Sequence, residues 1–95
     1  MPETHFTLRW PDGFEERCYS PSSVIGELLS AGTSYPMKDF LHRTRIALVR
    51  ASNRVEAKYG FACSSAMAQL DQIEVRAATF DGQDDATVTC LNISQ

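Results

Sequence analysis

The strongest constraint on the fold is a long helical pattern between Pro36 and Gly60. Its inward-facing residues recur at three- and four-residue steps and form one stripe: Met37, Phe40, Leu41, Thr44, Leu48, Ala51 and Val55. Proline is favoured at the start of a helix, and glycine is favoured just after its end. The pattern therefore predicts one helix from Pro36 to about Tyr59, and the stripe requires a second layer to cover it.

The N-terminal residues predict a β-hairpin. Residues 5–10 alternate in polarity, with their large apolar side chains on one face, as in a half-buried strand. The sequence PDG at 11–13 is typical of a tight turn, because proline fixes φ and glycine accepts a positive φ. We therefore expect a second strand over about 14–19 that pairs back onto the first.

Two shorter helices are expected on either side of the long one. Ser20 is typical of a helix N-cap, Pro21 of a first helical position, and Gly32 of a helix end. We therefore expect a short helix from Pro21 to Gly32. After Gly60 a third helix is expected from about Ser64 to Thr79.

The last residues predict a final strand over 86–93. Either of two alternating sets could face inward, and the sequence leaves both open: Val88, Cys90 and Asn92, or Thr87, Thr89, Leu91 and Ile93. The expected order is β-β-α-α-α-β. We predict an α+β fold in which a three-stranded antiparallel sheet carries the helices on one face, with the last strand beside the first.

The composition indicates one soluble globular domain over residues 1–95. Apolar residues make up 43% of the chain and charged residues 22%, which are ordinary values for a packed domain. A net charge of −3 disfavours nucleic acid and anionic membranes as partners. We see no apolar run long enough for a membrane span and no secretory signal, so we expect a cytoplasmic protein.

The three cysteines, Cys18, Cys63 and Cys90, are widely spaced and odd in number. This is not the pattern of a disulfide framework, and the sequence has no close ligand pair of the C-x-x-C type that zinc sites use. His5 and His42 could complete only a scattered metal site with the thiols, which is the weaker interpretation. Phosphate-binding glycine loops are missing as well. We therefore expect no metal and no cofactor.

Cys63 is the one candidate nucleophile, because it lies in the sequence YGFACSS just before the expected third helix. A helix start stabilises a thiolate, but a catalytic cysteine also needs a base, and the sequence brings neither His5 nor His42 to it. Cysteine is also among the most frequently buried residue types. We therefore favour packing over reactivity for Cys63 and expect no enzymatic activity.

The long helix is basic. Residues 36–60 contain six lysines and arginines against two acidic residues. Four of the basic residues share one face: Arg43, Arg50, Arg54 and Lys58. We expect ion pairs with the third helix, Arg54 with Asp71 and Arg50 with Glu74, to neutralise much of this face. A surface that binds anions or nucleic acid is the alternative, but a helix-turn-helix reader is disfavoured because its second helix would be net negative.

Four stretches of the sequence resemble one family: RWPDGFEERCYSPSS, SYPMKDF, ASNRVEAKYGFACS and AMAQLDQIE. The family consists of small bacterial nitrogen-starvation-response proteins encoded in gene clusters with a Nit1-type nitrilase. The resemblance covers about Phe6 to Ala78. It implies a context of nitrile or cyanide nitrogen assimilation, beside enzymes such as a radical-SAM protein, an acetyltransferase, a synthetase and a flavoprotein. It implies no catalytic residues.

We therefore predict a non-catalytic accessory or regulatory protein that acts by binding a partner protein or by self-association. Enzymes of the same gene cluster are the expected partners, and Ile46 and Val49, which lie off the helical stripe, indicate a second contact surface. The alternative is a small-molecule-binding module or a minor enzyme. Its site would combine residues near the turn between the second and third helices with residues of the hairpin: Arg54, Tyr59, Cys63, Arg17 and Tyr19.

Overall fold

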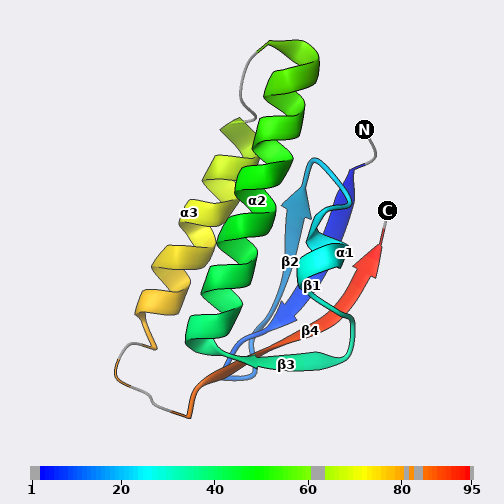
Figure 1. The fold of residues 1–95 in the computed structure, drawn as a ribbon. Coiled ribbons are helices and arrows are strands. Elements are labelled where there is room, and N and C mark those ends of the chain that lie inside the picture. Colours follow the sequence, from blue (N-terminus) through cyan, green and yellow to red (C-terminus); the bar gives the residue numbers. More distant parts are fainter. Residues whose placement is uncertain (1–2, 61–63, 81, 83–84, 95) are drawn as a thin grey trace.

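The computed structural model describes residues 3–60, 64–80, 82 and 85–94. Its helices and strands are, in chain order, β1 (Thr4–Arg9), β2 (Glu15–Ser20), α1 (Ile25–Leu28), β3 (Thr33–Pro36), α2 (Met37–Tyr59), α3 (Ser64–Ala78) and β4 (Thr87–Ser94). The strands form one antiparallel sheet in the order β2-β1-β4-β3. The helices α2 and α3 pack against each other on one side of this sheet, and the short α1 lies against α2 on the same side (Figure 1).

The sheet has four strands, so the predicted three-stranded sheet is wrong. The additional strand, β3, pairs antiparallel with β4 and places Tyr35 opposite Val88. The stretch TSYP carries no strand signal, because four residues are too few to show alternation and Pro36 indicates a helix start. In fact Pro36 is both the last residue of β3 and the N-cap of α2. Proline is tolerated there because β3 is an edge strand, whose outer side needs no donor.

The last strand, β4, lies beside β1 as predicted, but its alternation is interrupted. The pairing shifts between Thr7 and Leu8, so Leu91 is an extra residue on β4 in a β-bulge. Before the bulge Val88 is fully buried, and after it Ile93 packs against the core. Each of the two alternating sets is therefore right for only one part of the strand.

The long helix forms and ends where the sequence predicts. Gly60 caps α2 with a φ of 86°, and its N–H donates to the carbonyl of Glu56 (2.8 Å). The first helix, in contrast, is much shorter than predicted. Ser20 does not act as its N-cap, because the Ser20 hydroxyl donates a hydrogen bond to the carbonyl of Ser22 (2.8 Å) and makes a turn instead.

The core lies between the sheet and the helices. Its largest fully buried apolar side chains come from β1, α1, α2, α3 and the segments beside them: Trp10, Phe6, Phe40, Leu8, Ile25, Leu29, Leu48 and Ile73. Burying a side chain of this size stabilises the fold by about 1.5–3 kcal/mol. Among the described residues, no helix combines the length and apolar character that a membrane crossing requires.

Candidate functional site

The sheet separates the residues that the sequence predicts as a ligand site. Arg17 and Tyr19 alternate along β2 with residues buried under the helices, so both side chains lie on the open face. Arg54 lies on α2, on the helical side. Tyr59 is the last residue of α2 and is 54% exposed, and Cys63 lies outside the described residues. The structure thus brings Arg17 and Tyr19 together, but not with Arg54.

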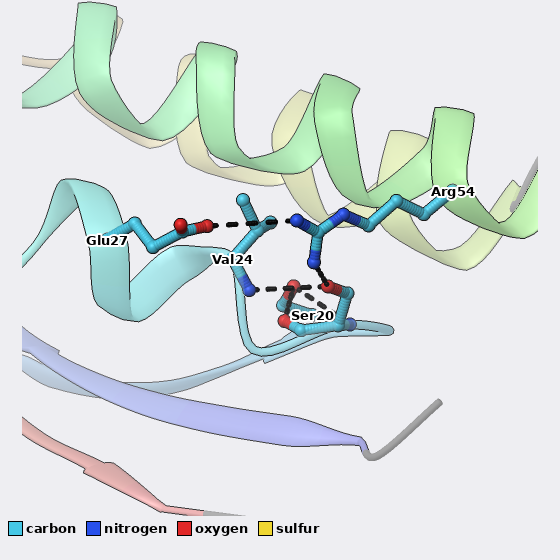
Figure 2. Close-up of polar contacts among 5 residues, drawn as sticks. Ser20, Val24, Glu27 and Arg54 are labelled. Carbon is cyan, nitrogen blue, oxygen red and sulfur yellow. Dashed lines mark hydrogen bonds and ion pairs between the residues drawn. The ribbon is translucent and has the colours of Figure 1, made fainter.

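Arg54 is held by the turn that follows β2, as Figure 2 shows. Its Nη1 donates a hydrogen bond to Ser22 Oγ (3.2 Å), and its Nη2 lies 3.9 Å from Glu27 Oε2. The same Ser22 oxygen accepts a hydrogen bond from the backbone N–H of Val24 (3.2 Å). Because Ser20 and Ser22 are almost fully buried, this network fastens the loop between β2 and α1 to α2. We assign Arg54 a structural role, which the sequence did not reveal.

The open face of the sheet is polar and carries basic and aromatic side chains. Its members, which alternate with the buried residues, include His5, Thr7, Arg9, Glu15, Arg17, Tyr19, Ser34, Thr89 and Asn92. The register places Tyr19 opposite His5, with ring centroids 5.9 Å apart, and places Arg17 opposite Thr7. Arg17 is exposed and forms no salt bridge within the described part of the chain.

The ion pairs of α2 differ from the predicted ones. The sequence predicts that Arg50 and Arg54 pair with acidic residues of α3, and among the described residues neither pair is present. Glu74 of α3 instead pairs with Arg45 (2.5 Å), and Arg54 lies near Glu27 of α1. The prediction fails because the sequence does not show how α2 is rotated about its own axis. In the structure this rotation places Arg45 beside α3 and Arg54 beside α1.

The thiols of Cys18 and Cys90 are buried on either side of β1. Two strand spacings, roughly 9–10 Å, separate their strands, which is too far for a disulfide. Burial raises the pKa of Cys18 to about 12, and the nearby carboxylate of Glu16 acts in the same direction. Burial also raises the pKa of Cys90. Both thiols therefore stay protonated and unreactive near neutral pH.

A hollow of about 680 Å³ lies at the N-terminal end of α2, far from Gly60. Met37, Lys38 and Leu41 line it from α2, Ala77 lines it from α3, and Phe80 lines it from the segment after α3. The helical stripe assigns Met37 and Leu41 to the inward side but gives no sign of a hollow. Its existence depends on the separation between the start of α2 and the end of α3, which only the tertiary structure fixes.

The fold and these surfaces define a small two-layer α+β protein with an open sheet face and a partly apolar hollow. Within the described residues, no group of His, Cys, Asp and Glu side chains is arranged to hold a metal ion. The model of a protein family described as "Nitrogen starvation-induced protein NitG" matches residues 5–93, and the chain belongs to this family. No curated protein and no solved structure matches the chain. The resemblance noted in the sequence is thus confirmed at the level of the family.

Proposed function

We propose that the protein is a non-catalytic accessory or regulatory protein of the nitrogen starvation response, which binds a partner protein through the open face of its sheet. The observation that carries this proposal is that, in the described part of the chain, the helices lie on one side of the sheet, while the other side presents arginine, tyrosine and histidine. Arginine and tyrosine are enriched in protein interfaces and at their energetic hot spots.

The charge of this face favours an acidic partner surface. Arg9 is paired with Glu15 at the edge of the face (3.0 Å), whereas Arg17 projects into solvent without a salt bridge in the described residues. His5 adds a further polar side chain opposite Tyr19, on the side of Arg17 away from Arg9. Complementary charge across an interface raises the association rate and orients the partner.

The proposed partners are enzymes encoded in the same nitrilase gene cluster, which would place the protein in nitrile or cyanide nitrogen assimilation in the cytoplasm. Self-association through the same face is the second form of this proposal. Both forms require the open face to become buried in the complex, so both predict that substitutions there weaken the complex.

The test is capture of the purified cluster enzymes by the immobilised protein, together with size-exclusion chromatography and light scattering of the protein alone. Arg17→Glu should weaken the complex at least tenfold, because it places a carboxylate against an acidic partner. Arg50→Glu is the matched control, since Arg50 is exposed on α2, away from the open face. A strict monomer that captures none of these enzymes contradicts the proposal.

The alternative, a small-molecule-binding module or minor enzyme that uses Cys63, stays a prediction. Labelling with iodoacetamide across pH tests its reactive-thiol form, with Cys63→Ser as the reference. Labelling of Cys63 that becomes rapid below pH 7 supports a lowered thiol pKa. Slow labelling that needs a pH above about 8, the range of an ordinary thiol, removes this form of the alternative.

A further inference from the structure

The hollow at the N-terminal end of α2 has the size of a small-molecule site. Its volume of about 680 Å³ lies within the range of known ligand pockets, roughly 300–1,000 Å³. It is bounded by the start of α2, the end of α3 and the residue that precedes β4, Ala86. It lies on the helical side of the sheet, so an occupant would not compete with a partner on the open face.

The floor of the hollow is apolar. Phe80 is 9% exposed, Ala77 is 4% exposed and Ala86 is 7% exposed, and all three belong to the core cluster. Met37 and Leu41 of α2 are partly buried against the same cluster. An occupant that touches this floor must offer an apolar surface, because the floor side chains have no polar groups to replace lost hydrogen bonds with water.

Among the described residues that line the hollow, Lys38 is the one cation. Glu74 lines the hollow, but its carboxylate is bound to Arg45 (2.5 Å). Asp39, in the first turn of α2, is bound to Arg43 (2.9 Å). Lys38 lines the hollow and forms no salt bridge with any described residue. The positive end of the α2 dipole acts in the same direction as the Lys38 ammonium group.

We propose that this hollow binds a small organic monocarboxylate, with its carboxylate at the Lys38 ammonium group and its aliphatic or aromatic body against Phe80 and Leu41. A single charge fits because Lys38 is the one cation among the described lining residues, and it forms no salt bridge with another described residue. A second carboxylate would have to lie on the apolar floor, where it would lose its hydration without a partner.

The molecule carries an internal probe of this site. Trp10 is the single tryptophan of the chain and is 1% exposed. Its ring stacks on Phe80 with centroids 6.1 Å apart and planes 11° apart. Because Phe80 forms a wall of the hollow, contact between an occupant and Phe80 should change the environment of Trp10 and therefore its fluorescence.

The proposal is tested by titrating the full chain with hexanoate and with phenylacetate, following Trp10 emission and backbone amide NMR shifts. We expect saturable changes, with NMR shifts confined to the residues around the hollow: 36–41, 74–80, 82 and 86. Hexanol and hexylamine, which have the same chain without the negative charge, should bind at least tenfold more weakly. Inorganic phosphate, which has charge without an apolar body, should also bind at least tenfold more weakly.

Two pairs of variants test the charge of Lys38 and the space in the hollow separately. Lys38→Met should weaken hexanoate binding at least fivefold without changing hexanol binding, whereas Lys58→Met, at the other end of α2, should change neither. Ala78→Phe should fill the hollow from an exposed position and abolish binding of both compounds, while Ala68→Phe, exposed near the start of α3, should not. Unsaturable titrations, equal binding by Lys38→Met, or NMR shifts away from the hollow would overturn the proposal. Capture of partners by the open face is measured separately, so its failure is distinguishable from failure here.

Discussion

The two ends of α2 differ in how the surrounding structure uses them. At the C-terminal end, the residues from 53 to 59 are exposed or half-buried, and Arg54 is occupied by the turn around Ser22. At the N-terminal end, Met37 and Leu41 pack against the core beside the hollow. The sequence motifs that contain glycine, serine and cysteine lie at the C-terminal end. The hollow lies at the N-terminal end, where no motif of known binding chemistry is present, because a cavity arises from the spacing of helices rather than from a local turn.

The largest expected effect compares one apolar deletion at each end. Phe80→Ala should lower the free energy of unfolding by about 3 kcal/mol, because Phe80 is nearly buried and stacks on Trp10. Val55→Ala, in the half-buried part of α2 near its C-terminal end, should cost about 1 kcal/mol. Urea unfolding followed by circular dichroism measures both. Equal losses of unfolding free energy in the two variants would contradict the difference in packing between the two ends of α2.

A second prediction concerns Glu16, whose carboxylate supports the stacked rings of Trp10 and Phe80 behind the hollow. Glu16 Oε1 accepts from Trp10 Nε1 (3.0 Å) and pairs with Arg76 (2.9 Å). Glu16→Ala should lower the free energy of unfolding by about 2 kcal/mol, because it leaves the buried indole N–H without an acceptor. The neighbouring Glu15→Ala is the control, since the exposed pair with Arg9 contributes only about 0–1 kcal/mol. Similar costs for the two variants would refute the role assigned to Glu16.

The third prediction concerns the buried thiol of Cys18, in the sheet below α2 and α3. The pKa of Cys18 is about 12 in the folded protein against 9.0 for a free thiol, so the folded state holds this proton more tightly. Its contribution to stability is complete below pH 9 and is lost as the pH rises toward 12, by at most about 1.4 kcal/mol per pH unit. Cys18→Ala should therefore show a shallower loss of unfolding free energy between pH 9 and 11 than the native chain. Parallel pH curves for the two proteins would contradict this assignment.

The smallest expected effect is at the C-terminal end of α2. Gly60→Ala should cost about 1 kcal/mol, because its φ of 86° is unfavourable for a residue with a Cβ. Gly26→Ala is the matched control: Gly26 lies in α1 with no positive φ and with open space where the added methyl group would lie, so this change should stabilise the protein by about 0.5 kcal/mol. Thermal unfolding of both variants should give shifts of opposite sign, and shifts of the same sign would count against the capping role of Gly60.

The elements that the sequence predicts correctly are those with strong local signals. The long helical stripe and Gly60 define α2, and the PDG turn, with Gly13 at a φ of 88°, defines the hairpin. The elements that it misses depend on partners far along the chain. β3 is stabilised by pairing with β4, and the bulge at Leu91 exists only because β4 must fit against β1.

The site was predictable to a smaller extent. Strand alternation is enough to place Arg17 and Tyr19 on one face, and this holds. The position of Arg54 was not predictable. Its partners Ser22 and Glu27 lie in a turn and a short helix, and the sequence predicts one longer helix in their place. Nothing in the local sequence around Lys38 or Phe80 marks a cavity, since SYPMKDF carries no known binding chemistry and Phe80 belongs to none of the stretches singled out.

The pairing of β1 with β4 also has a practical consequence. His5 lies opposite Ser94, so the start of β1 and the end of β4 are neighbours in space, as Figure 1 shows. A short flexible linker could join them and turn β4 and β1 into a new hairpin, with the chain reopened within the turn at 12–13. Such a circular permutant would have its new chain ends at the other end of β1, where a fluorophore could be attached.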